Sequence, residues 1–208
     1  MTTHCDFFRQ SVQGLMTIHR AGTLGHWNHF LALEHDLDQL SRFVDFSGND
    51  GTYSLEIARI LLGASSEVDV VLKRICQRVQ PNSAADTIGA YHPEVTANCP
   101  NFIHYEIQIP RYGLTHQPWL NWTANQPPTW WSDHNKVKHQ RDQYFDRATL
   151  KNCLNAVGGL FVAVLHLYEA EAAVGDLLQL PRLFNVEDRF FGGTQIGRYG
   201  NSFRYKVR

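Results

Sequence analysis

A mainly α-helical fold is predicted by two long stretches in which apolar residues recur at helical spacing. One runs from Tyr53 to Val79 and the other from Asp146 to Val174. Between them lies a segment rich in proline and tryptophan, with one short run that alternates apolar and polar residues as β-strands do. We therefore expect a helical bundle of four to five helices with a small β-containing, Pro/Trp-rich insertion.

Length and composition are typical of one globular domain. The chain has 208 residues, of which 43% are hydrophobic and 19% charged, and its formal net charge is −1. A chain of this length buries a sizeable core without disulfides or metals. We expect a single domain over 1–208, with a helical core at about 30–80 and 130–175, an insertion at about 81–129 and a basic, aromatic tail at about 185–208.

Two amphipathic helices are expected in the first half, after a leading extended or short helical segment at 1–30. The first lies within 31–47, where Leu33, Leu37, Leu40 and Val44 share one face, and the loop SGNDG ends it. Ser54 is expected to cap the second helix. The apolar stripe of that helix contains Ile57, Leu61, Ala64, Val68, Val71 and Ile75.

The segment 80–129 is expected to be non-helical, because it holds seven of the chain's eight prolines and proline disrupts helix interiors. Its run FIHYEIQI predicts a short strand or hairpin. Its tryptophans are expected to fold back onto the helical core.

Two further helices are expected in the second half, the first capped by Ser132 or Asp133 and the second by Asp146. The stretch Val157–Val174 is strongly apolar but contains a histidine and two glutamates, so it is expected to be a core helix and not a membrane span. The stripe of the second helix contains Leu150, Leu154, Val157, Phe161, Val164 and Tyr168.

Cysteine and histidine spacing argues against a metal site or a cofactor. The four cysteines form no CxxC pair, and Cys76 and Cys153 lie in apolar helical patterns as core thiols would. His134 and His139 are five residues apart, which does not place them on one helical face. We expect a reducing, cytoplasmic compartment and no metal.

The tail RFFGGTQIGRYGNSFRYKVR holds five basic residues, five aromatic residues and no acidic one. We favour aromatics that pack on the bundle and charges that stay in water. The alternative is a segment that follows a nucleic-acid backbone and stacks bases on its aromatics.

The strongest candidate site is the polar stretch that follows Trp130 and Trp131. Asn135 and His139 are four residues apart and share a helical face, with basic residues around them. Histidine serves as general acid or base, lysine and arginine hold phosphate, and asparagine orients an imidazole or a ribose hydroxyl. The alternative is a solvated helix start with one structural histidine.

An acidic pair in the second helix is the other candidate. Asp69 and Lys73 are four residues apart, a spacing that stabilises a helix surface. Alternatively, Glu67, Asp69 and Lys73 lie at the rim of a groove and orient basic groups of a neighbouring helix.

Four stretches together resemble the HEPN proteins, helical nucleotide-binding or RNase domains of toxin–antitoxin and phage-defence systems. They are YSLEIARILLGASSEVDVVLKRIC, WW, NKVKHQR and ATLKNCLNAVGGLFV, within about residues 30–80 and 128–170. DVVLKR is similar to an acidic-to-basic pattern of that family, and His139 matches its histidine. In that family an arginine precedes the histidine with four to six residues between them; here it is absent, since Ser132, Asp133 and His134 stand at those positions.

The resemblance implies a homodimer with a composite site between protomers, and an antitoxin or other protein as partner; no membrane partner is expected. It implies binding of RNA or a nucleotide, with metal-independent RNA cleavage as the activity. The alternative is a non-catalytic dimeric interaction module that uses the same helix and the Trp-rich insertion as a partner surface. The expected catalytic residues are His139, Asn135 and Arg141, and the expected substrate-binding residues are Lys136, Lys138, Lys73, Glu67 and Asp69.

Overall fold

The computed structural model describes residues 23–207 and is mainly helical, as expected, although the seven α-helices in this range exceed the four to five predicted. Two of the extra helices are short pieces, α5 and α7, that follow longer ones. Most of the leading segment, 1–22, lies outside the described residues. The helices are α1 (Gly25–Leu40), α2 (Leu55–Val79), α3 (Ile88–Asn98), α4 (Thr129–His139), α5 (Arg141–Tyr144), α6 (Leu150–Leu167) and α7 (Glu169–Val174).

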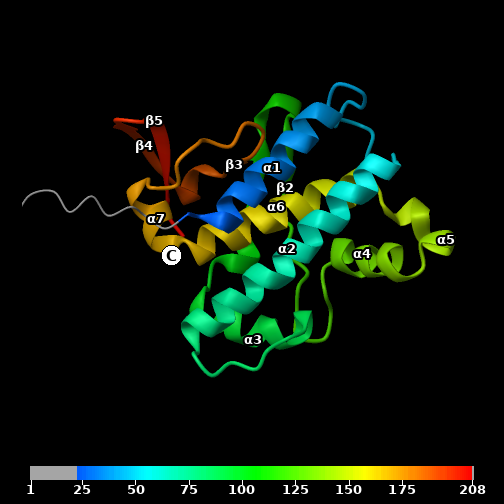
Figure 1. Ribbon diagram of the computed structural model, residues 1–208, viewed down its shortest axis with the longest axis horizontal. Helices are drawn as coiled ribbons and strands as arrows, with labels where there is room; N and C mark the ends of the chain where they lie inside the picture. Colours follow the sequence, from blue (N-terminus) through cyan, green and yellow to red (C-terminus); the bar gives the residue numbers. More distant parts are fainter. Residues whose placement is uncertain (1–22, 208) are drawn as a thin grey trace, which may run out of the picture.

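The core of the bundle is the pair α2 and α6, which pack along each other (Figure 1). Ser54 caps α2 as expected, since its hydroxyl accepts a hydrogen bond from the backbone N–H of Ile57 at 3.2 Å. Every residue of the predicted α2 stripe is buried. α1 packs on both helices, and it begins six residues before the expected start and ends at Leu40.

α6 is buried on nearly all sides. Thr149 caps it, by accepting from the N–H of Asn152 at 3.2 Å, so the expected cap at Asp146 is wrong. Asp146 instead lies in a 3-10 turn, Phe145–Arg147. By length and composition α6 could span a membrane, but 83% of its residues are buried inside the protein. It is therefore the core helix that the sequence predicted.

Two adjacent glycines let other elements approach α6 closely. A Cβ added at Gly159 would lie 3.1 Å from Cζ2 of Trp130 and 3.4 Å from Cζ2 of Trp119, both rigid indole rings. A Cβ at Gly158 would collide with the side chain of Ile107. This face of α6 therefore packs directly against the insertion.

The insertion contains a helix, α3, that was not expected. Thr87 caps it by accepting from the N–H of Ala90, and its turns bury Tyr91 and Val95 against the core. Pro93 lies inside this helix. A proline forfeits one backbone hydrogen bond there, and burial of two large side chains offsets this cost.

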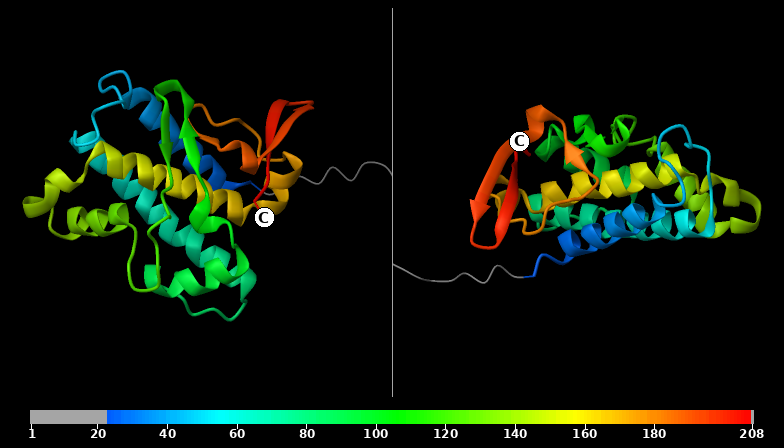
Figure 2. Two further views of the ribbon diagram at one scale, coloured as in Figure 1. Left: turned by 180° about the vertical axis from the view of Figure 1, so that it is seen from behind. Right: turned by 90° about the horizontal axis from the view of Figure 1, so that it is seen from above.

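The rest of the insertion forms the predicted hairpin, β1 (Ile107–Ile109) with β2 (Leu114–His116). β3 (Asn185–Val186) pairs antiparallel with the other edge of β1, so the sheet order is β2-β1-β3 (Figure 2). The five tryptophans of the chain are all buried. The four that belong to the insertion and to the start of α4 fold back on the core as expected.

The C-terminal segment is held to α1 by a buried carboxylate. Glu34 is 2% exposed and accepts three backbone hydrogen bonds of 2.8–3.0 Å, from the N–H groups of Arg182, Leu183 and Phe184. Burial raises the pKa of Glu34, and the three donors act in the opposite direction. One side chain thus fixes a loop that lies about 150 residues away in sequence.

Beyond this loop the chain forms a second hairpin, β4 (Phe191–Gly197) with β5 (Gly200–Tyr205). Phe190 and Tyr205 at its base are buried, as expected of a tail whose aromatics pack on the bundle, whereas Tyr199 near its tip is exposed and departs from that expectation. The hairpin lies at one end of the molecule and α4–α5 at the other (Figures 1 and 2).

Glu34→Ala is expected to destabilise the fold by on the order of 3 kcal/mol, because three buried N–H groups lose their acceptor. Glu34→Gln keeps one acceptor oxygen and should cost less. Urea denaturation measures both changes, with His35→Ala, an exposed neighbour on α1, as the control. A loss for Glu34→Ala no larger than that for His35→Ala would contradict the structural role of this carboxylate.

Candidate functional site

α4 begins three residues before Ser132, so the expected cap at Ser132 or Asp133 is wrong. The cap position is Pro128, with no side-chain hydrogen bond, and Trp130 and Trp131 form the first turn. Burial of the two indoles decides this start, and the Trp130 ring N–H also donates to the Pro118 carbonyl at 2.9 Å. As a result His139 is the last residue of α4 and not near its beginning.

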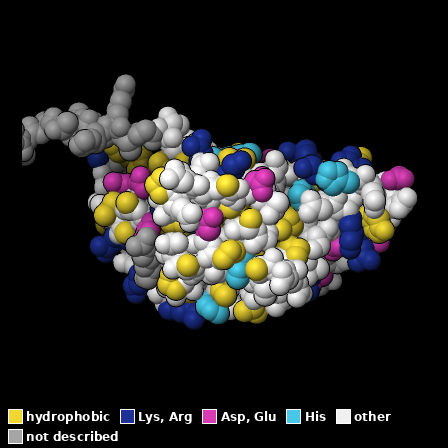
Figure 3. All heavy atoms as spheres, turned by 90° about the horizontal axis from the view of Figure 1, so that it is seen from below, with side chains coloured by type: hydrophobic (Ala, Val, Ile, Leu, Met, Phe, Trp, Pro, Cys, Tyr) yellow, Lys and Arg dark blue, Asp and Glu magenta, His cyan; other side chains and the backbone are white. Residues whose placement is uncertain are grey.

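The end of α4 is basic and open to solvent. We call Lys136, Lys138, His139 and Arg141 the α4 basic end; all four are exposed, and Asn135, one turn before His139, is half-buried. Figure 3 shows Lys, Arg and His side chains, with some acidic ones, at the end of the molecule formed by α4 and α5. Cations are favoured there because a helix C-terminus carries partial negative charge.

Lys136 is the member of this group that is tied to the protein. Its ammonium group lies 3.2 Å from Oδ1 of Asp133 and 5.9 Å from the centre of the Tyr144 ring. Lys138 and Arg141 make no ion pair among residues 23–207. They are therefore the two cations of α4 and α5 best placed to meet an anion from solution.

The predicted acidic residues of α2 bind other helices. Glu67 faces α1, with its carboxylate 2.5 Å from Nδ1 of His26 and 3.0 Å from Nδ1 of His29. Asp69 faces α3 and accepts a hydrogen bond from the Tyr91 hydroxyl at 3.2 Å. Within the described range, no hydrogen bond or ion pair links either carboxylate to α4. Lys73, the third predicted residue of this group, is exposed on α2.

The contact between Tyr91 and Asp69 is partly buried, and it affects the pKa of the Tyr91 hydroxyl. Burial raises that pKa first, and the nearby Asp69 carboxylate raises it further. Asp69 therefore acts as a structural acceptor between α2 and α3.

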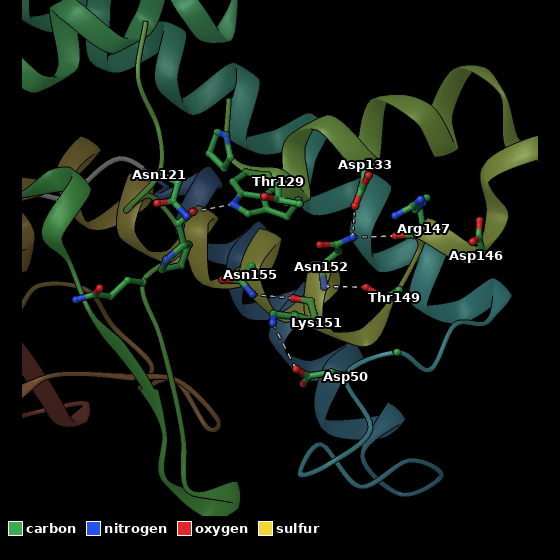
Figure 4. A pocket seen from close by; sticks show the side chains of 15 residues that line it. Asp50, Asn121, Thr129, Asp133, Asp146, Arg147, Thr149, Lys151, Asn152 and Asn155 are labelled. Carbon is green, nitrogen blue, oxygen red and sulfur yellow. Dashed lines mark hydrogen bonds and ion pairs between the residues drawn. The ribbon is translucent and has the colours of Figure 1, made fainter. Parts of the chain in front are cut away.

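A polar cavity of about 600 Å³ lies at the other end of α4, where α4 and α6 begin (Figure 4). Asp133 of α4 closes one wall, since it accepts from the Asn152 side-chain amide of α6 at 3.0 Å. The same amide donates to the carbonyl of Arg147 at 2.9 Å. The Asp133–Asn152 contact therefore joins α4 to α6 and to the turn before α6.

The opposite wall comes from the loop before α2 and the next turn of α6. Lys151 lies 3.6 Å from the Asp50 carboxylate, and the Asn155 amide donates to the Lys151 carbonyl at 2.8 Å. His116 at the end of β2 lies 3.4 Å from that amide, and burial lowers its pKa. Cationic, anionic and amide side chains thus all line this space.

Spacing along the chain does not reveal this cavity, because its lining comes from five separate segments: the loop at 50–51, the insertion at 117–128, the start of α4, the turn at 146–149 and the start of α6. One signal was present. Lys151, Asn152 and Asn155 are polar residues in a helix that is otherwise apolar.

His134, which stands where the HEPN-like pattern would place an arginine, is buried. It is 4% exposed, packs 5.3 Å from the Trp131 ring, and its Nδ1 has no hydrogen-bond partner among the described residues. Burial lowers the pKa of His134 to about 4, and the positive charge of Lys138 acts in the same direction. The imidazole is thus neutral and held inside the protein.

His134 should therefore make the protein less stable as the pH is lowered. Between its ordinary pKa of 6.5 and its folded pKa of about 4, the unfolded chain binds a proton that the folded chain does not. We expect wild type to lose about 1 kcal/mol more than His134→Phe between roughly pH 7.5 and 5.5. Urea denaturation at the two pH values measures this difference.

His35→Phe, at an exposed position of α1, is the matched control and should lose as much as wild type. His116 contributes a loss of the same sign in every one of these variants. Equal pH dependence in wild type and His134→Phe would contradict a lowered pKa at His134.

No group of three His, Cys, Asp or Glu side chains in residues 23–207 is arranged to hold a metal ion. Comparisons with known proteins add no assignment: no family model matches the sequence, and neither a curated protein nor a solved structure matches the chain.

Proposed function

We propose that the protein binds RNA at the α4 basic end and cleaves it there without a metal ion. The observation that carries the proposal is the joint exposure of Lys138, His139 and Arg141 where α4 ends. An RNA strand reaches this imidazole from solvent, whereas His134 in the same helix is buried. The sequence resemblance to HEPN proteins supports the same class of activity.

The chemistry needs only groups of this surface. His139 accepts the proton of a ribose 2′-hydroxyl, whose oxygen attacks the adjacent phosphorus. The bond from phosphorus to the 5′ oxygen breaks, which leaves a 2′,3′-cyclic phosphate, and the leaving oxygen takes a proton. Lys138 and Arg141 hold the charged phosphate, and Asn135, one turn before His139, orients the imidazole or a ribose hydroxyl.

Arg141 takes the place of the arginine that is missing before His139. Its planar guanidinium can bind two phosphate oxygens at once, which a lysine ammonium cannot. We further propose a cytoplasmic homodimer with an antitoxin or other protein partner. A second copy would supply a second His139 as the acid for the leaving group.

Lys138→Ala and Arg141→Ala are expected to weaken RNA binding and its salt dependence. For a single strand, the slope of log affinity against log salt concentration should fall by about 0.7 for each phosphate contact removed. Fluorescence anisotropy with a labelled single-stranded RNA measures both quantities. Arg42→Ala, an exposed arginine after α1, is the charge-matched control and should bind as wild type does.

His139→Ala is expected to lower the cleavage rate by about 100-fold or more while leaving RNA binding nearly intact. Gel analysis of a labelled RNA in the presence of a chelator measures cleavage. Equal cleavage by wild type and His139→Ala would exclude a catalytic role, and unchanged binding in both basic variants would exclude this surface.

Nucleotide binding in the polar cavity is a second candidate function, favoured by its lining. Arg147 and Lys151 supply positive charge beside three aspartates of the lining, and side-chain amides such as Asn155 match the donors and acceptors of a nucleobase. The cavity volume of about 600 Å³ is within the range of small-ligand sites.

A nucleoside monophosphate in excess is expected to raise the melting temperature of wild type, because a ligand that binds only the folded state stabilises it. Lys151→Ala and Arg147→Ala should reduce that shift, and Arg42→Ala should keep it. Absence of a shift with each of the four common ribonucleotides would exclude this use of the cavity.

A further inference from the structure

The β4–β5 hairpin is anchored at its base and free at its tip. At the base, Tyr205 is 3% exposed, and Phe191 and Phe203 pack edge to face with ring centres 5.3 Å apart. The N–H of Lys206 donates to the carbonyl of Phe190 at 2.7 Å and closes the base. The strands then project from the end of the bundle that carries α7 (Figure 2).

The tip presents an aromatic ring to solvent. Tyr199 is 80% exposed and Ile196 is 85% exposed. The guanidinium carbon of Arg198 lies 5.8 Å from the centre of the Tyr199 ring. The paired glycines Gly197 and Gly200 flank this turn, and Gly200 has a positive φ of +109°, which favours glycine. The fold therefore displays Tyr199 and Arg198 together on a tight turn.

The charged residues of the hairpin segment are all basic. Residues 189–207 contain four basic residues and no acidic one, although the whole chain has a formal net charge of −1. Arg189 is engaged by Glu187 and by the carbonyl of His104. The other three, Arg198, Arg204 and Lys206, are exposed and make no ion pair among the described residues.

The surroundings of the hairpin leave these cations available. Arg204 and Lys206 line a shallow hollow of about 370 Å³ between β5 and α7, together with Glu169. The Glu169 carboxylate lies 3.7 Å from the guanidinium of Arg78 on α2. A polyanion that follows β5 would thus meet Arg204 on the strand, Lys206 directly after it and Arg198 at the tip.

We propose that the hairpin is a second RNA-binding surface, on which Tyr199 stacks on an unpaired base and Arg198, Arg204 and Lys206 contact phosphates. Exposed aromatics combined with a basic track are how sequence-tolerant single-strand binding is achieved. The choice of RNA rests on the proposed function, and the charge and the exposed ring are independent of it.

Position makes the two surfaces complementary. The hairpin and the α4 basic end lie at opposite ends of the molecule (Figure 1). α6, with 18 residues, is about 27 Å long and separates them. A strand too short to cover that length contacts one surface at a time. A longer strand contacts both, and its affinity is higher because the second contact forms within the same complex.

Tyr199→Ala is expected to weaken binding of a single strand of roughly 20 nucleotides about tenfold, the value of one lost base stack. Tyr199→Phe keeps the ring and should bind as wild type does. The double variant Arg198→Ala/Lys206→Ala should lower the salt slope by about 1.4, for two lost phosphate contacts. Fluorescence anisotropy over a range of salt concentrations measures all of these.

The loop after α1 provides matched controls, because Phe43 is 84% exposed and Arg42 beside it is exposed too. Phe43→Ala and Arg42→Ala remove the same kinds of side chain elsewhere and should leave affinity unchanged. Circular dichroism spectra that match wild type confirm that each variant is folded. With strands of about 4 nucleotides, which contact one surface at a time, either set of variants alone should leave binding at the other surface, and only the two sets combined should abolish both.

The outcomes separate this inference from the proposed function. Loss of RNA binding in the Lys138 and Arg141 variants with full binding by the hairpin variants would overturn the hairpin surface alone. The reverse pattern would overturn the α4 surface and support the hairpin. Anionic lipid vesicles that bind wild type but not Tyr199→Ala, with unchanged RNA affinity, would identify the hairpin as a membrane contact and overturn the inference.

Discussion

Burial of α6 is the constraint on which the rest of the structure depends. A helix that is apolar on nearly every side is stable in water only if other elements cover it all round. α2 and α1 cover part of it, α4 another part, and the insertion closes the face that Gly158 and Gly159 keep flat. This packing directs the tryptophans inward, and it leaves the polar sides of the covering helices as the surfaces for function.

The same constraint explains what sequence predicts well and what it does not. α2 and α6 were predicted because their apolar periodicity is long and their burial follows directly from it. α3 and the start of α4 were not predicted, because Pro93 and Pro128 argue locally against a helix at those positions. In both cases the burial of aromatic side chains against α6 and α2 overrides the local preference of the chain.

For the candidate sites, sequence predicts which residues of one helix lie together, but it does not predict contacts between segments that are far apart in the chain. The positions of His139 and Asn135 on one face follow from their spacing within one helix, and the structure keeps that spacing. The partners of Glu67 and Asp69 lie on α1 and α3, which spacing inside α2 cannot reveal. The polar cavity depends on five segments that come together only in the folded chain.

The contact between Glu34 and residues 182–184 has a consequence for the order in which the chain is made. Its donors follow it by about 148 residues. At ordinary rates of synthesis on the ribosome, this corresponds to a delay on the order of 10 s. During that interval the carboxylate stays hydrated, and for most of it, until α6 has been made, the apolar face of α1 has only α2 to cover it. Completion of the core must therefore wait for the last quarter of the chain, when a chaperone could still bind the unfinished bundle.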